Sequence, residues 1–169
     1  TEFYNHDAFN GTVFIKGNDA KIKDTTFINN NATNGAAIFI QGNGANIINS
    51  VLNNNTATNG TIYVKGSDTV VSESTLKFNN ATNGAGIFIK GAGSTISKSN
   101  FTNNTVTYHG GAVYIDGSNT KFENNNFINN TARANDTFSK LSGLGGAIYV
   151  KGQNTISIGN NFEHNVARN

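Results

Sequence analysis

The stretch "IYVKG" occurs at Ile62–Gly66 and again, letter for letter, at Ile148–Gly152. The same order of aliphatic, aromatic, aliphatic, polar and glycine residues stands at four more places: Val13–Gly17, Ile38–Gly42, Ile87–Gly91 and Val113–Gly117. Successive copies begin 25, 24, 25, 26 and 35 residues apart. A period of this length indicates a repeat architecture, in which each unit buries its apolar face against the next unit.

Two other apolar positions recur with the same period. One heads an Asn-rich segment, at Phe3, Phe27, Leu52, Leu76, Phe101, Phe127 and Phe162. The other precedes it by five residues in most units, at Ile22, Ile47, Val71, Ile96 and Phe122, and we assign its place in the last unit to Ile156. Short runs of Ile, Val, Phe and Tyr between Gly and Asn residues are typical of strands. Each unit is therefore predicted to contain three short strands.

Stacking such units, with each strand beside its counterpart in the next unit, predicts an all-β solenoid, a parallel β-helix. We expect one domain over residues 1–169, with about six to seven coils of about 25 residues. The chain contains no Pro, which agrees with strands that have a hydrogen-bonded neighbour on both sides.

The hexapeptide "NNATNG" is repeated at Asn30–Gly35 and at Asn79–Gly84. Because Asn and Gly tolerate left-handed backbone conformations, we interpret it as a corner that recurs once per coil. Asparagines three residues after the apolar landmark would then lie above one another and form an amide ladder between coils. These are Asn30, Asn55, Asn79, Asn104, Asn130 and Asn165.

Composition argues against several functional classes. Charged residues make up 13% of the chain and the formal net charge is +2, without the clustered Lys and Arg that nucleic-acid binding requires. The chain has no Cys and three scattered His, so no metal site or cofactor is predicted. The apolar runs are far shorter than the roughly 20 residues that span a bilayer.

Alternate residues of a strand face opposite sides, so the two aliphatic residues of "IYVKG" share one face and the aromatic and polar residues share the other. Ile and Val suit a narrow interior, which places the aromatic residues outside in one column: Phe14, Phe39, Tyr63, Phe88, Tyr114 and Tyr149. Two residues further on runs a polar row: Lys16, Gln41, Lys65, Lys90, Asp116 and Lys151. Asp116 is expected to form a surface ion pair with a neighbouring Lys.

Two interpretations of this face remain open. Rings on neighbouring parallel strands also pack on each other for stability, at about 0.2–1 kcal/mol per pair. Alternatively, aligned rings beside cationic groups form a ligand-binding face for a sugar or a partner protein.

The last repeat is longer than the others, with an insertion at about residues 133–144 that contains Arg133, Asp136 and Lys140. Solenoids place insertions as loops on one face, often the binding face. We expect this loop to project beside Tyr114 and Tyr149 and include its three charged residues in the candidate binding site. A tolerated loop without function is the alternative.

An enzyme would need carboxylates, or a carboxylate with a base, at one level of the helix. The best such cluster is His109, Asp116, Asp136 and Lys140. A polysaccharide-degrading lyase or hydrolase is therefore the alternative function, but no catalytic residues are predicted. Ice binding, which needs a regular Thr array, is disfavoured because the small-residue column beside the aromatic residues has Thr only at positions 12 and 61.

Some of the repeats carry paired "GGA" and "FxxN" motifs: "GGAV" at Gly110–Val113, "GGAI" at Gly145–Ile148, "FINN" at Phe27–Asn30 and Phe127–Asn130, "FTNN" at Phe101–Asn104 and "FEHN" at Phe162–Asn165. These resemble the repeats of chlamydial polymorphic membrane proteins and, more closely, adhesin-like surface proteins of methanogenic archaea. The resemblance implies a right-handed β-helix outside the cell that attaches to a glycan or a surface protein of a host or partner cell. We expect a monomeric segment of a larger surface protein, with a purely structural stalk as a further alternative.

Overall fold

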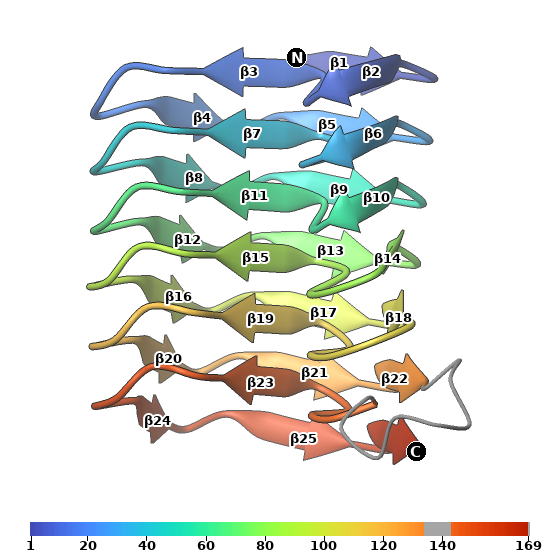
Figure 1. Ribbon diagram of the computed structural model, residues 1–169, viewed down its shortest axis with the longest axis vertical. Coiled ribbons are helices and arrows are strands. Elements are labelled where there is room, and N and C mark those ends of the chain that lie inside the picture. Colours follow the sequence, from blue (N-terminus) through green and yellow to red (C-terminus); the bar gives the residue numbers. More distant parts are fainter. Residues whose placement is uncertain (134–142, 169) are drawn as a thin grey trace.

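The computed structural model describes residues 1–133 and 143–168. Within them, short strands follow one another around a solenoid, and every pair of neighbouring strands is parallel (Figure 1). Four sheets run the length of the molecule, with six or seven strands in each. The expected parallel β-helix of about six to seven coils is thus confirmed. No helix that could cross a membrane occurs in the described residues.

Sheets A and B have seven strands each. Sheet A consists of β1 (Glu2–Tyr4), β5 (Thr26–Ile28), β9 (Val51–Asn53), β13 (Thr75–Lys77), β17 (Asn100–Thr102), β21 (Asn126–Ile128) and β25 (Asn161–Glu163). Sheet B consists of β2 (Asp7–Asn10), β6 (Asn31–Asn34), β10 (Thr56–Asn59), β14 (Asn80–Ala81), β18 (Thr105–Val106), β22 (Thr131–Arg133) and β26 (Val166–Arg168).

Sheets C and D have six strands each. Sheet C, which holds the repeated "IYVKG" pattern, consists of β3 (Val13–Ile15), β7 (Ile38–Ile40), β11 (Ile62–Val64), β15 (Ile87–Ile89), β19 (Val113–Ile115) and β23 (Ile148–Val150). Sheet D consists of β4 (Lys21–Lys23), β8 (Asn46–Ile48), β12 (Val70–Ser72), β16 (Thr95–Ser97), β20 (Lys121–Glu123) and β24 (Ile156–Ile158).

Each coil therefore has four strands, and the expectation of three was wrong. The missed strands are those of sheet B, which include the middle of the "NNATNG" hexapeptide. Apart from Phe9 in β2, most of their outward residues are polar, and their inward residues are mostly Ala, so these strands lack the run of large apolar side chains that marks a strand in the sequence. These inward residues pack into a small cluster of their own: Ala32, Ala36, Ala57, Ala81, Ala85, Val106 and Ala132.

Four corners turn the chain in each coil, and each contains a residue with positive φ. In one coil these are Asn29 (57°), Gly35 (56°), Gly44 (68°) and Asn49 (48°). Asn and Gly adopt this conformation at the lowest cost among the residues. The hexapeptide is thus not one corner but a strand with a corner at each end.

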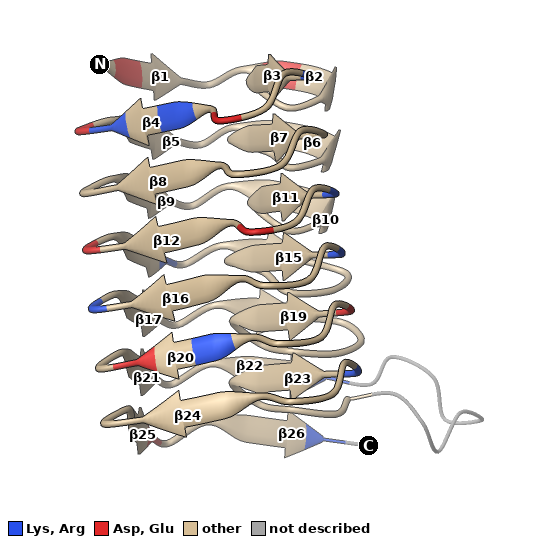
Figure 2. Cartoon of the chain, turned by 90° about the vertical axis from the view of Figure 1, so that its left-hand side faces the viewer, with Lys and Arg blue, Asp and Glu red and all other residues tan. Residues whose placement is uncertain are grey.

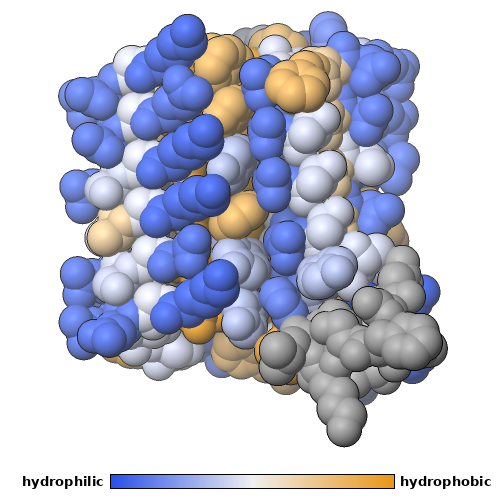
Figure 3. Space-filling view, in the orientation of Figure 1, coloured by the Kyte–Doolittle hydropathy of each residue, from blue (hydrophilic) through white to orange (hydrophobic). Residues whose placement is uncertain are grey.

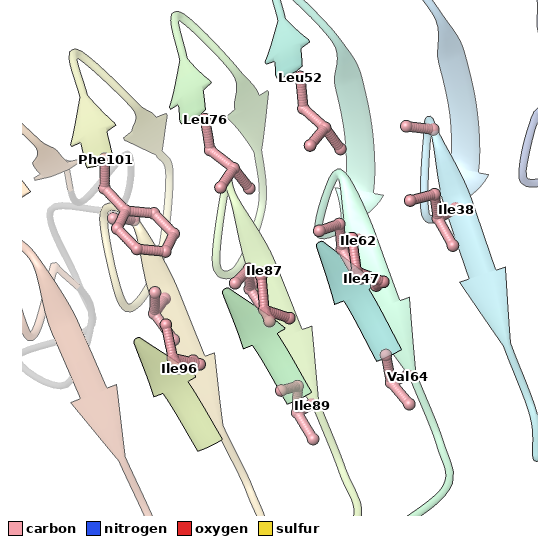
Figure 4. Packing of buried hydrophobic residues seen from close by; sticks show 14 of the residues in the cluster. Ile38, Ile47, Leu52, Ile62, Val64, Leu76, Ile87, Ile89, Ile96 and Phe101 are labelled. Atoms are coloured by element: carbon pink, nitrogen blue, oxygen red, sulfur yellow. The ribbon is translucent and has the colours of Figure 1, made fainter. Parts of the chain in front are cut away.

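The interior of the coil is filled by the aliphatic residues of sheets C and D and the apolar landmark of sheet A (Figure 4). Phe101 and Phe127 are fully buried, and their rings stack at 4.8 Å. Leu52 and Leu76 occupy the same column without rings and are equally buried. In the inner coils, the apolar residue that heads the Asn-rich segment and the apolar residue five positions before it are therefore both confirmed as core residues.

The amide ladder is also confirmed. Asn55 Nδ2 donates at 3.0 Å to Oδ1 of Asn79, and the backbone N–H of Asn55 donates to the same oxygen at 3.0 Å. The second side-chain hydrogen of Asn55 bonds the carbonyl of Phe27 at 3.1 Å. Each ladder amide thus satisfies backbone groups that the corner would otherwise leave unpaired, which is what a buried polar residue must achieve.

The last coil departs from the expected pattern. Ser157, not Ile156, is paired with the core residue Phe122, and Ile156 and Ile158 face outward. The assignment of Ile156 to the core position was wrong because the spacing to Phe162 is one residue longer than in the other units. This coil lies at the end of the described solenoid, where the core is open to solvent.

Candidate functional site

The aromatic column lies on the outer side of sheet C. Its flanking aliphatic residues, such as Ile62 and Val64, are buried in the coil interior, whereas Phe39, Tyr63, Phe88 and Tyr114 form a separate cluster. The rings therefore point away from the interior, as the alternation of side chains predicts.

The same rings are nevertheless covered, and the expectation of an exposed aromatic face was wrong for the inner coils. Only 2% of Phe39 and 6% of Tyr114 are accessible to solvent. Phe14 and Phe39 stack at 4.9 Å between ring centroids, and Phe39 stacks on Tyr63 at 5.0 Å. Because each inner ring packs between the rings of the coils before and after it, and both faces of Phe39 are stacked, the inner column offers a sugar no open ring face.

The rings are also covered from both sides of the column. Lys65 Nζ lies 5.4 Å from the Phe39 ring centroid, and Lys151 Nζ lies 5.7 Å from that of Tyr114, so lysine ammonium groups lie over two of the rings. On the other side, the corner glycine Gly60 comes so close that an added Cβ would lie 3.0 Å from Cβ of Phe88. Glycine at this corner therefore allows the chain to pass close to the base of the Phe88 side chain.

The polar row is exposed along its whole length. Lys65, Lys90, Asp116 and Lys151 are all exposed, and Figure 3 shows a ridge of hydrophilic side chains beside the column of more hydrophobic residues. Figure 2 shows basic positions and one acidic position one above another at the ends of the sheet C strands. The row is therefore a predominantly cationic ridge, which we call the lysine ridge: Lys16, Gln41, Lys65, Lys90, Asp116 and Lys151.

Asp116 forms the expected ion pair, with its Oδ1 3.8 Å from Nζ of Lys151. Hydrogen bonding to Tyr114, together with the charge of Asp116, raises the pKa of Lys151. Lys151 is therefore positively charged at neutral pH. Its charge is partly compensated by Asp116 within the protein. An exposed pair of this kind contributes little to folding stability.

His109 joins the aromatic column at its C-terminal end. Its ring stacks on Tyr149 with 4.7 Å between centroids, and its Nδ1 accepts a long hydrogen bond of 3.4 Å from the backbone N–H of Leu144. Burial, and then the nearby charge of Lys151, lowers the pKa of His109. The imidazole is therefore neutral near pH 7.

The three charged residues predicted in the insertion have different outcomes. Arg133 belongs to strand β22, is exposed and pairs in register with Arg168, so it is part of sheet B and not of a loop. Asp136 and Lys140 lie outside the described residues. The described end of the insertion does approach the aromatic column, because Gly143 N–H donates at 2.9 Å to the carbonyl of Tyr108, next to His109.

Sequence reasoning missed a trough of about 540 Å³ on the outer side of sheet B. It runs across β2, β6 and β10, with Ala8, Ala32 and Ala57 at its floor. Side chains two residues apart on each strand form its two walls: Asp7 and Phe9, Asn31 and Thr33, Thr56 and Thr58. The alternation in "DAF", "NAT" and "TAT" is the available signal, but the hexapeptide that contains "NAT" was interpreted as a corner.

Within residues 1–133 and 143–168, no group of three or more His, Asp or Glu is placed to hold a metal ion. Of the cluster proposed for the catalytic alternative, Asp116 is paired with Lys151 and Asp136 lies outside the described residues. That alternative stays a hypothesis.

Comparison with known proteins agrees with the fold. No characterised protein and no solved structure shows significant similarity to the chain. A family model described as a right-handed β-helix region matches residues 11–169, which is most of the sequence. Proteins with this fold include enzymes and binding proteins, so the fold alone does not assign an activity. With its parallel sheets, its core and its repeats in agreement with that match, the chain belongs to the right-handed β-helix family.

Proposed function

We propose that the protein is a non-catalytic adhesin module displayed outside the cell, which attaches to a glycan or a protein on the surface of a host or partner cell. The lysine ridge provides the attachment surface in this proposal. The covered aromatic column beneath it provides a rigid support.

The observation that carries the proposal is the repetition of exposed cations in register. Lys65 and Lys90 directly follow the paired ends of the neighbouring strands β11 and β15, one strand spacing of about 4.8 Å apart. Lys16 and Lys151 extend the row toward the two ends. A row of weak identical contacts suits a polymeric or densely displayed ligand, because simultaneous engagement raises the total affinity far above that of one contact.

The extracellular location is supported by the resemblance of the "GGA" and "FxxN" motifs to repeats of surface proteins. It is also consistent with a surface dominated by Asn, Ser and Thr. The partner is expected to be anionic where it meets the ridge, since the ridge presents four lysines and one aspartate.

A glycan array that carries uronic-acid, sulfated and neutral oligosaccharides tests the proposal. Replacing Lys65, Lys90 and Lys151 with Ala should abolish binding, and raising the salt concentration should weaken binding of the unmodified protein. The matched control replaces Lys21, Lys23 and Lys98, which are exposed on other parts of the molecule, and changes the net charge equally. If both variants lose binding equally, the loss reflects the change in net charge, and the ridge is not a specific binding surface.

A structural spacer is the second candidate, and the continuous amide ladder favours it. From Asn30 to Asn165, each described ladder amide bonds the one in the next coil. Such a rod would hold other domains away from a surface without binding anything itself. Absence of binding on the array, and no effect of the lysine variants on cell attachment, would favour the spacer.

A further inference from the structure

We propose that the trough on sheet B is a second recognition site, a subsite for a neutral saccharide with Phe9 as its stacking platform. This inference rests on the proposed function, because it assigns a ligand class to a surface of the same recognition module. It concerns a different face from the lysine ridge, so the two can be tested separately.

The first step is the exposure of Phe9. It is 73% accessible to solvent, and within residues 1–133 and 143–168 no other ring is stacked on it, in contrast to the rings of sheet C. A single exposed apolar residue is common on protein surfaces. Phe9 differs because it forms one wall of the trough and so presents its ring to a polar cavity.

The second step is the polar group beside the ring. Asp7 and Phe9 are two residues apart on β2 and therefore point to the same side of the sheet, roughly 7 Å apart. Asp7 Oδ1 accepts a hydrogen bond of 3.0 Å from Nδ2 of Asn31. This bond orients the carboxylate and leaves further lone pairs free to accept hydrogen bonds from a ligand.

The third step is the remaining lining. Beyond Asp7 and Phe9, the walls consist of Asn31, Thr33, Thr56 and Thr58, whose amide and hydroxyl groups both donate and accept. The backbone at the inward-facing alanines forms the floor, so a ligand can approach the backbone of the sheet closely. An apolar ring face next to alternating donors and acceptors matches a pyranose, which has an apolar C–H face and hydroxyl groups around its edge.

The charge of the trough lining determines which class of saccharide it can bind. The lining contains one charged side chain, the carboxylate of Asp7, and no Lys, Arg or His. A uronic acid or a sulfated sugar would therefore place a negative charge near Asp7 without a compensating cation. The trough is thus suited to neutral sugars, whereas the lysine ridge is suited to anionic ligands.

The test titrates the protein with neutral hexose oligosaccharides and, separately, with uronic-acid oligosaccharides, followed by calorimetry or by NMR shifts. We expect Phe9→Ala and Asp7→Ala each to weaken binding of the neutral oligosaccharides by about tenfold or more. Tyr4→Ala is the matched control, since Tyr4 is also an exposed ring, on sheet A, and it should leave the affinity unchanged. Unfolding curves of the variants should match that of the unmodified protein, because both changed side chains are exposed.

The outcomes separate this inference from the proposed function. Neutral-sugar binding that survives both Phe9→Ala and Asp7→Ala, or no binding of neutral sugars at all, would overturn the subsite. If only uronic-acid oligosaccharides bind, and binding depends on Lys65 and Lys90, the adhesin proposal stands and the subsite fails. If neutral sugars bind through Phe9 while the ridge variant behaves like its control, the subsite stands and the ridge is not the attachment surface.

Discussion

Asn79 and Asn104 are joined by two hydrogen bonds to one oxygen. The side-chain Nδ2 of Asn79 donates to Oδ1 of Asn104 at 3.0 Å, and the backbone N–H of Asn79 donates to the same oxygen at 3.2 Å. Asn79 also donates to the carbonyl of Leu52 and accepts two bonds from Asn55. One amide thus links three coils, which makes it a sensitive test of the ladder.

Asn79→Ala is expected to lower the free energy of unfolding by about 3–5 kcal/mol, because several buried donors and acceptors lose their partners. Asn79→Asp should cost more, since it places a charge next to Oδ1 of Asn104 and the carbonyl of Leu52. Urea denaturation measures both. Asn126→Ala removes an exposed amide bonded to Asn100 and should change stability by less than about 0.5 kcal/mol. Similar losses for Asn79→Ala and Asn126→Ala would contradict a structural role of the buried ladder.

Phe78→Asn should stabilise the fold by about 1 kcal/mol. Phe78 has a φ of 55° and is 53% exposed, at a corner where Asn54 and Asn103 stand in the neighbouring coils. Asn relieves the left-handed strain and can join the amide pair that Asn54 makes with Asn29. Phe78→Ala keeps the strain and should show no gain in thermal denaturation. A gain as large for Ala as for Asn would mean that removal of the exposed ring is responsible.

Phe127→Ala should destabilise the protein by about 3–5 kcal/mol, because it leaves a cavity between stacked rings. Phe127 is fully buried and stacks on Phe101 at 4.8 Å and on Phe162 at 5.0 Å. Lys65→Ala, on the exposed ridge, should be close to neutral. Denaturation midpoints that coincide for the two variants would show that the interior has been assigned to the wrong side of the strands.

Tyr114→Ala should destabilise the fold by about 3 kcal/mol, although its ring lies outside the coil interior. The ring is 6% accessible and is covered by Phe88 at 4.5 Å and Tyr149 at 5.3 Å. Tyr108→Ala removes a side chain that is 42% accessible to solvent and should cost much less, about 1 kcal/mol or below. Thermal unfolding of both variants checks this, and a neutral Tyr114→Ala would mean that the outer column is not a second core.

The lowered pKa of His109 predicts a pH dependence of stability. The folded state resists protonation of this imidazole, whereas the unfolded state accepts the proton at the ordinary histidine pKa. The stability of the unmodified protein relative to His109→Gln should therefore be highest above that pKa and fall as the pH drops through it. Denaturation at several values between about pH 8 and 5 measures the difference. A difference that does not change with pH, or that grows toward low pH, would contradict the inference.

The repeat, the parallel stacking and most of the core can be read from the amino-acid sequence. The spacing of Phe27, Phe101 and Phe127 placed them in one column because identical positions of a solenoid must lie above one another. The ladder of buried asparagines followed from the same argument. These features depend on residue type and period alone, and both can be read from a linear chain.

Which side chains the outer faces expose could be learned only from the three-dimensional packing. Whether Tyr63 or Tyr114 is covered depends on the distance between neighbouring strands, on lysine ammonium groups placed over rings and on glycine corners that approach them. Alternation of side chains gives the direction of a ring but not the presence of atoms above it. The trough beside Phe9 was hidden for a related reason: small and polar residues form a strand there because strands of neighbouring coils pair with it, and that stabilisation leaves no apolar pattern in the sequence.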